Sequence, residues 1–322
     1  MLPPTLHLIT GGTPGLICDA KITATALLNN FPVRVNLSRQ RYLHLPHRRF
    51  SLRLQKLASN KKHIAVFFEN IPSCWINAVD QFVLIPNQEW VRPETQSNLA
   101  RCQKIWCKTH YAEQKFRERG FEAQYIGFTS TDRFLPAVSK DYSRFVHIPG
   151  RSDLKGTSTL IHVWQRHPEW PTLKIVTRQK HFLRFAAPNI EILTKYLDET
   201  TLNMLMNSAG VHICPSETEG FGHYINEALS TKAVVVTTNA PPMNELVQSD
   251  FGILVKHSAV TQQGFGERFH VDAIDLERGI ESVLTMGHTE KSAMGEGARA
   301  SFIEKKRAFE LAINQAAMKI SE

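Results

Sequence analysis

The sequence lacks several features that would assign it to a membrane or secreted class. No run of apolar residues approaches the ~20 that a transmembrane helix needs, and the first ten residues lack the basic, apolar and cleavage-site pattern of a secretory signal. Its five cysteines form no Cys-x-x-Cys pair, so we expect reduced thiols. These absences favour a cytoplasmic globular protein without a transmembrane segment, which leaves peripheral contact with the inner membrane surface open.

Acidic residues are missing between Asp19 and Glu69, where ten lysines and arginines occur. Residues 48–57 can form a helix with Phe50, Leu54 and Leu57 on one face. Four basic residues occupy or adjoin the other face: Arg48, Arg49, Arg53 and Lys56. Such a helix can lie on an anionic membrane, follow the phosphates of a nucleic acid, or dock on its own domain by the apolar stripe. The net charge of +8 favours an anionic partner in general.

Alternating strand and helix patterns along 322 residues predict an α/β protein of two domains. The expected strands are short and apolar, as in doubly wound parallel sheets. They cover residues 5–10, 64–68, 81–85, 104–107, 125–128, 145–148, 173–177, 190–193, 211–214 and 234–237. Helices are expected at 19–29, 48–57 and 112–119, and a linker at 129–142. We place the domains at 1–137 and 138–288, with a C-terminal helix over 289–322.

One stretch, residues 209–229, combines an apolar strand, a glycine-rich turn and the start of a helix. Glu219 and Glu227 bracket the start of that helix. The glycines allow close approach of the backbone, and the helix start offers amide donors for an anion. Amides for phosphate and carboxylates for hydroxyls suit a nucleotide sugar. A plain strand-to-helix turn with solvated acids would have the same spacing.

The segment Pro-Ser-x-x-Glu-Gly-Phe-Gly, with its second glutamate eight positions after the first, resembles the Glu-x7-Glu motif of retaining GT-B glycosyltransferases of family 4. Gly150-Arg151 and Lys155-Gly156 resemble the Gly-Arg…Lys-Gly segment of that family, and residues 233–238, 245–247 and 252–255 resemble its following strands and acidic turn. The resemblance covers residues 145–256. It implies a GT-B fold, in which two doubly wound Rossmann-like domains face each other across a cleft.

The resemblance also implies roles for single residues. Arg151 and Lys155 would contact the donor diphosphate, Glu219 the sugar hydroxyls, and Glu227 the ribose hydroxyls. The remaining expected donor contacts are Gly12, Gly150, Arg178, Gly220, Phe221, Gly222, His223 and Tyr224. The sequence has no Asp-x-Asp motif for a metal-bound diphosphate, so we expect no metal and no cofactor beyond a UDP- or GDP-linked sugar donor.

Polar residues follow two expected strands of the first domain, where the carboxyl ends of parallel strands form a ligand crevice. Glu69 follows the first of these strands, and Asn87 and Glu89 follow the second. Many family 4 enzymes have a histidine near the second place, and this chain does not. His110 is a further acceptor-side candidate, although a lone histidine is more often structural.

Three functions fit these patterns. The first is a retaining glycosyltransferase whose acceptor is a surface or lipid-linked glycan. The second is a DNA-modifying glycosyltransferase acting on a hydroxylated base, which would have to flip out of the duplex. The third, from another class, is a GT-B protein that binds a nucleotide or glycan without transfer.

Overall fold

The computed structural model describes residues 3–37, 46–58 and 61–321. It divides the chain into two compact units. Unit 1 consists of residues 1–131, 262–266 and 305–322, and unit 2 consists of residues 132–261 and 267–304. The division falls between Thr131 and Asp132, inside the expected linker.

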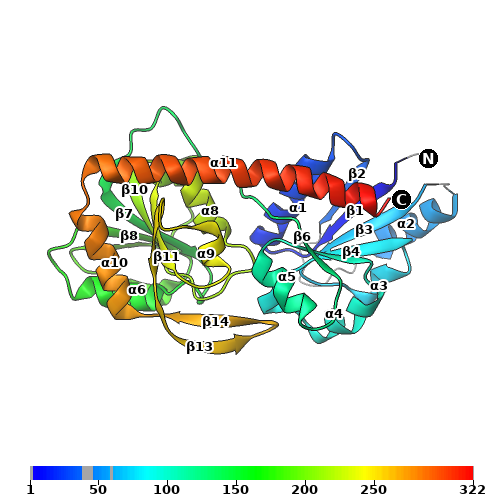
Figure 1. Ribbon diagram of the computed structural model, residues 1–322, viewed down its shortest axis with the longest axis horizontal. Coiled ribbons are helices and arrows are strands. Elements are labelled where there is room, and N and C mark those ends of the chain that lie inside the picture. The colour runs from blue at the N-terminus through cyan, green and yellow to red at the C-terminus, as the bar shows by residue number, and fades with distance from the viewer. Residues whose placement is uncertain (1–2, 38–45, 59–60, 322) are drawn as a thin grey trace. The chain divides into compact units, whose positions relative to one another are not determined.

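Unit 1 contains a parallel sheet with the strand order β2-β1-β3-β4-β5-β6 (Figure 1). Its strands are β1 (Thr5–Thr10), β2 (Val33–Leu37), β3 (His63–Phe68), β4 (Gln81–Ile85), β5 (Lys104–Cys107) and β6 (Ala123–Tyr125). Its helices are α1 (Pro14–Leu27), α2 (Pro46–Ala58), α3 (Ser73–Ile76), α4 (Pro93–Asn98) and α5 (His110–Arg117), with short 3₁₀ turns η1 (Gln88–Trp90) and η2 (Leu99–Arg101).

Unit 2 contains a second parallel sheet, ordered β12-β11-β10-β7-β8-β9. Its strands are β7 (Asp141–Gly150), β8 (Leu173–Thr177), β9 (Ile190–Leu193), β10 (Ala209–Cys214), β11 (Val234–Thr238) and β12 (Gly252–Val255). Its helices are α6 (Thr157–Gln165), α7 (Glu199–Ser208), α8 (His223–Ser230), α9 (Met243–Leu246) and α10 (Ala273–Thr285), with the 3₁₀ turn η3 (Lys180–Phe185).

Two further elements contribute residues to both units. The strands β13 (His257–Gln263) and β14 (Gly266–Val271) form a hairpin whose turn, residues 262–266, belongs to unit 1. The long helix α11 (His288–Lys319) belongs to unit 2 up to residue 304 and to unit 1 from residue 305. Within unit 1, Phe309 of α11 packs on Phe128 with ring centroids 4.7 Å apart.

Each unit has its own apolar core, because the strands are short buried runs with helices packed on the sheet. In unit 1, Phe67 and Phe82 of the sheet pack in one cluster with Trp75 of α3 and Phe116 of α5. In unit 2, Phe145 of β7 contacts Trp164 of α6 in the corresponding cluster. No helix in the described residues is both long enough and apolar enough to cross a membrane.

Several expected boundaries are wrong. Helix α1 begins at Pro14 rather than 19, because the hydroxyl of Thr13 accepts from the amide of Leu16 and the proline fits the first helical turn. The sixth strand covers Ala123–Tyr125 instead of 125–128. Strand β7 begins at Asp141, inside the expected linker. The edge strand β2 and the β13–β14 hairpin were not expected at all.

The expectation that α2 could dock by its apolar stripe is also wrong. Phe50, Leu54 and Leu57 are 64%, 50% and 84% exposed, whereas Leu52 on the opposite face is buried. The side chains of Arg49 and Lys56 point toward the rest of unit 1, where they donate to the carbonyls of Cys74 and Val79, and Arg53 is exposed. The side chain of Arg48 lies outside the described residues.

Candidate functional site

The glycine-rich motif of unit 2 joins β10 to α8, as the sequence predicts. Gly222 has φ +102° and caps α8, and a Cβ atom there would come within 2.9 Å of Leu246. Glycine is therefore required where the chain turns into the helix. The turn itself, including Gly220 and Phe221, is buried.

A second loop, between β7 and α6, packs directly on this motif. It runs from Gly150 to Gly156, and both glycines have positive φ, +63° and +62°. A Cβ atom on Gly156 would lie 2.2 Å from the carbonyl oxygen of Pro215. The amide of Glu217 also donates to the carbonyl of Leu154 at 2.9 Å. The two sequence blocks that carry the resemblance are thus in contact.

This packing brings Lys155 and Glu219 into an ion pair, with both side chains largely buried. Glu219 also accepts from the hydroxyl of Ser216, and that hydroxyl lies 2.6 Å from the hydroxyl of Tyr224. The Lys155 ammonium lies 4.4 Å from the centre of the Tyr224 ring. A cation, a carboxylate and a helix start therefore meet in one place, which is the chemistry that a sugar phosphate requires.

His147 connects the elements that carry these two loops. Its ring nitrogens lie 2.7 Å from the carbonyl of Ile213 and 2.8 Å from the hydroxyl of Thr157. Burial lowers the pKa of His147 to about 4, so the ring is neutral at physiological pH. It ties the ends of β7 and β10 to the first turn of α6.

Glu227, on α8, is held by an arginine that was not predicted. Arg133 donates to Glu227 at 3.2 Å, and also to Glu199 at 2.8 Å and to Asn203 at 3.1 Å. Burial raises the pKa of Glu227, and Arg133 opposes that rise. Arg133 lies in the expected linker, where nothing in the sequence pattern marks it as a partner of the motif.

The other expected donor residues are distributed around these loops. Arg151 and Arg178 are exposed, and the amide of Arg178 donates to the carbonyl of Gly150 at 2.8 Å. The guanidinium of Arg178 lies 5.6 Å from the Tyr196 ring centre. His223 begins α8. Gly12 belongs to unit 1, in the loop between β1 and α1, so it is in a different unit from the other donor residues.

In unit 1, Glu69 and Asn87 are brought together at the carboxyl ends of β3 and β4. The Asn87 amide donates to Glu69 at 3.0 Å, and Lys108 donates to Asn87 at 2.6 Å. Lys108 also donates to Asp19 of α1 at 3.0 Å, with both of those side chains buried. Glu69 has φ +65°, a conformation that costs a non-glycine residue of order 1–3 kcal/mol and that clusters at functional sites.

Lys108 and Asp19 were missed as members of this cluster. Lys108 follows β5, so the rule that selected Glu69 and Asn87 could also have selected it. Asp19 lies on the buried side of a helix, where the sequence offers no signal. The two other candidates lie elsewhere in unit 1: Glu89 is buried beside the turn at Gly264, and His110 is exposed and stacks on Tyr125 at 3.7 Å.

Comparisons with known proteins agree with the fold. Residues 187–300 match the family model described as Glycosyl transferases group 1. Comparison with curated protein sequences gives no match.

Solved structures that are similar in fold extend over the whole chain. Sucrose-phosphate synthase from Thermosynechococcus elongatus has a TM-score of 0.72 at 12% identity, covering 99% of both chains. A glycosyltransferase from Rickettsia africae has a TM-score of 0.70 at 15% identity, covering 100% of this chain and 98% of the other. Anabaena HepE, in complex with UDP and glucose, has a TM-score of 0.65 at 17% identity and covers 99% of both chains.

These similarities confirm the predicted GT-B fold class, with its two parallel-sheet α/β units. The family match lies in unit 2, which holds Glu219 and Glu227, except for residues 262–266. The chain therefore has a GT-B fold, and residues 187–300 within it match the glycosyl transferases group 1 family model.

Proposed function

We propose that this protein transfers a sugar from a nucleoside-diphosphate sugar, bound by unit 2, to a hydroxyl group of an acceptor. The observation that carries the proposal is the contact between the two loops of unit 2, which joins Lys155 to Glu219 beside the start of α8. Lys155 and Arg151 would hold the diphosphate, together with the amides at Gly222, His223 and Tyr224. Glu219 would accept hydrogen bonds from the sugar hydroxyls.

The nucleoside would bind through Glu227 and the surface near Arg178. Glu227 would accept from the ribose hydroxyls, with Arg133 keeping it ionised. Arg178 and Tyr196 lie together and offer a cationic and an aromatic surface to a base. UDP and GDP are the nucleotides we propose; the similar fold of HepE in its complex with UDP and glucose supports the first.

The reaction we propose retains the configuration at the anomeric carbon, as the resemblance to family 4 implies. The bond from the anomeric carbon to the β-phosphate oxygen breaks, and a bond from the same carbon to the acceptor oxygen forms on the same face. The acceptor proton passes to the departing phosphate oxygen, so no side-chain base is needed. Lys155 and Arg151 would stabilise the charge that develops on that phosphate without a metal ion; a chelator should leave activity unchanged.

The acceptor side is proposed to lie in unit 1, at the cluster of Glu69 and Asn87. The buried pair of Lys108 and Asp19 would fix the Asn87 amide, and Asn87 would in turn orient the Glu69 carboxylate toward an acceptor hydroxyl. We favour a surface or lipid-linked glycan as the acceptor. DNA with a hydroxylated base remains the second candidate, because residues 20–68 contain no acid.

The experiment offers radiolabelled UDP- and GDP-sugars to the purified protein with two acceptors in separate reactions. One is a membrane fraction carrying lipid-linked glycan, and the other is duplex DNA containing hydroxymethylated bases. Label in the membrane fraction would support the favoured acceptor, and salt-sensitive label in DNA would replace it with the second. Tight nucleotide binding with neither transfer nor hydrolysis would indicate a binding protein and contradict the proposal.

A further inference from the structure

Helix α2 presents its apolar side to solvent. Phe50, Leu54 and Leu57 share one face at a spacing of four and three residues, and all three are at least half exposed. A helix of a globular domain ordinarily turns such a stripe toward the core. An exposed stripe of this kind marks a surface that another partner covers.

The opposite side of α2 holds the helix on unit 1 largely by polar contacts. Arg49 donates to the carbonyl of Cys74 at 3.2 Å, and Lys56 lies 3.1 Å from the carboxylate of Asp80. Leu52 is the apolar residue of α2 that enters the unit 1 core. The helix is therefore anchored without its stripe, and burying the stripe would require these contacts to break.

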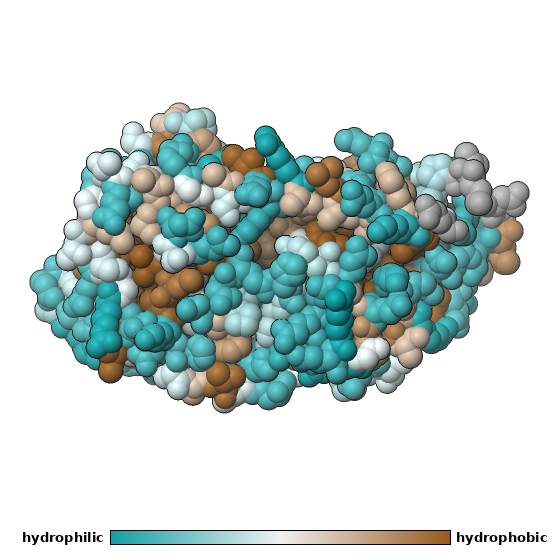
Figure 2. Space-filling view, viewed as in Figure 1, coloured by the Kyte–Doolittle hydropathy of each residue, from teal (hydrophilic) through white to brown (hydrophobic). Residues whose placement is uncertain are grey.

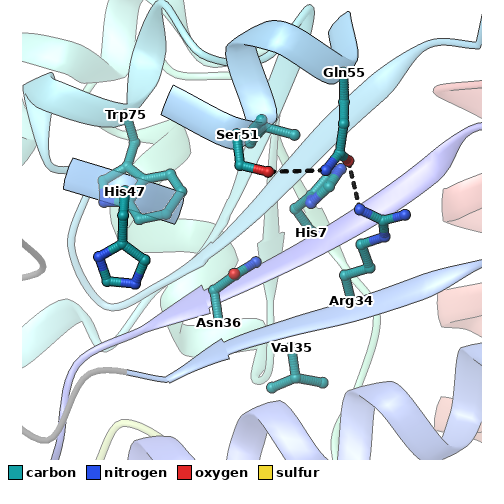
Figure 3. Close-up of a pocket in the computed structure, with 9 residues that line it drawn as sticks. His7, Arg34, Val35, Asn36, His47, Ser51, Gln55 and Trp75 are labelled. Carbon is teal, nitrogen blue, oxygen red and sulfur yellow. Dashed lines mark hydrogen bonds between the residues drawn. The ribbon is translucent and has the colours of Figure 1, made fainter. Parts of the chain in front are cut away.

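A cavity lined by polar and apolar side chains lies against α2. The cavity has a volume of about 410 Å³, and His7 and Arg34 line it from β1 and β2. Figure 3 shows Gln55 of α2 hydrogen-bonded to both Ser51 and Arg34. If rotated inward, Phe50 and the leucines would meet these polar groups as well as the apolar side chains of Val35 and Trp75, which also line the cavity.

The charge around the stripe has one sign. Arg53 is exposed and lies next to the stripe on the helix surface, and α2 contains no acidic residue. Figure 2 shows hydrophobic surface beside the grey atoms, at the end of the view where Figure 1 places α2. An apolar stripe beside an exposed arginine matches a layer of anionic headgroups over acyl chains.

We propose that α2 lies in the plane of an anionic lipid bilayer, with Phe50, Leu54 and Leu57 inserted at the headgroup boundary. Arg53 would contact lipid phosphates. A nucleic acid is disfavoured as the partner, because its phosphates would leave two exposed leucines uncovered. The proposal supplies the surface on which a lipid-linked acceptor of the proposed function would be met, but its test involves no sugar transfer, so either can fail alone.

The test is sedimentation of the full-length protein with lipid vesicles. One set contains phosphatidylcholine alone, and the other contains phosphatidylcholine with phosphatidylglycerol. We expect binding to the second set, weakened by salt. Leu57→Gln should weaken it about tenfold, since a leucine no longer leaves water, and Arg53→Gln about fivefold.

Matched controls separate this from general effects of the substitutions. Leu311 on α11 is 67% exposed, so Leu311→Gln changes a leucine that is also mostly exposed and should leave vesicle binding unchanged. Arg307→Gln serves in the same way for the charge. Thermal unfolding should show that Leu57→Gln is folded, because the Leu57 side chain is mostly exposed and makes few packing contacts.

Three results would overturn the proposal. The first is no sedimentation with anionic vesicles, or equal sedimentation of Leu57→Gln and the unmodified protein. The second is a shift to a dimer that Leu57→Gln abolishes, which would assign the stripe to a second copy. The third is binding to duplex DNA that depends on Arg53 and not on Leu57.

Discussion

At the residue scale, two effects act in opposite directions on the pKa of Glu227. Burial raises its pKa, and the guanidinium of Arg133 at 3.2 Å favours the ionised form. The proposed ribose contact needs the ionised form, because a carboxylate accepts from both hydroxyls whereas a carboxylic acid must donate one proton. Arg133 therefore acts on nucleotide binding through Glu227.

The variant Arg133→Gln should make nucleotide binding depend on pH. With the cation removed, the pKa of Glu227 rises further, so the carboxylate is lost at a higher pH than in the unmodified protein. Titration calorimetry with UDP or GDP should show affinity falling more steeply from pH 8 to pH 6. Arg144→Gln, an exposed arginine of the same unit, is the control. Parallel pH profiles for Arg133→Gln and the unmodified protein would refute this role.

Two lysines of unit 1 provide a second comparison at this scale. Lys108 pairs with Asp19 in the interior, and Lys104 pairs with Glu122 at the surface. Lys108→Met removes the cation that faces the buried carboxylate of Asp19 and should lower the free energy of unfolding by about 3–5 kcal/mol. Lys104→Met should cost at most about 1 kcal/mol. Urea denaturation measures both, and equal costs would mean that the interior pair is well solvated.

At the scale of the element, the last glycine of the loop before α6 decides whether that loop can pack on the glycine-rich motif. Gly150 and Gly156 have nearly the same positive φ, but a Cβ atom meets nothing within 4 Å at Gly150 and Pro215 at Gly156. Only the second glycine allows the loop that carries Lys155 to touch the motif.

This difference predicts unequal effects of the same substitution. Gly150→Ala should cost about 1 kcal/mol, because it adds backbone strain alone. Gly156→Ala adds overlap with a backbone atom and should cost upwards of about 3 kcal/mol, while displacing Lys155. Chemical denaturation of the two variants gives the comparison. A Gly156→Ala variant as stable as Gly150→Ala would show that the loops can separate freely.

Several correctly predicted strands, β3 and β4 among them, are buried on both faces, whereas β8 and β9 were predicted although buried residues alternate in them with partly or fully exposed ones. β3 and β4 are unbroken apolar runs, so composition alone identifies them. The edge strand β2 alternates apolar residues with Arg34 and Asn36 over only five residues, and β13 is mostly exposed and polar. The alternation in β2 is a strand pattern that was overlooked because it is short, whereas β13 has no pattern that distinguishes it from a loop.

In the candidate site, only the residues that stand in a short sequence motif could be predicted. Lys155 and Glu219 stand in short motifs that can be identified directly. Arg133 meets Glu227 only through tertiary structure, since 94 residues separate them. For α2, periodicity predicts an apolar stripe but not the direction in which it points, which depends on the tertiary contacts that hold the helix on unit 1.

At the scale of the whole molecule, buried histidines make stability depend on pH. Burial lowers the pKa of His7 and of His212 to about 3, and that of His147 to about 4. These side chains stay neutral in the folded protein, whereas the unfolded chain takes up protons below its ordinary pKa of 6.5. The stability they contribute is therefore present above pH 6.5 and lost as the pH falls toward 4.

The free energy of unfolding should fall by about 1.4 kcal/mol per pH unit for each such histidine below pH 6.5. Guanidinium denaturation between pH 7 and pH 5 would measure the slope. His212→Gln, although less stable at neutral pH, should show a shallower slope. The same slope in both proteins would mean that His212 is protonated in the folded state.

Sugar transfer from a nucleotide donor depends, in this account, on the contact of Lys155 with the motif of unit 2. The most direct test is turnover of the active nucleotide sugar by Lys155→Met, beside Lys174→Met, a surface lysine of the same unit paired with Glu191. We expect Lys155→Met to lose about 10²–10³ in kcat, because it removes a group that stabilises transition-state charge, and Lys174→Met to retain full activity. A folded Lys155→Met protein with unchanged kcat would contradict it.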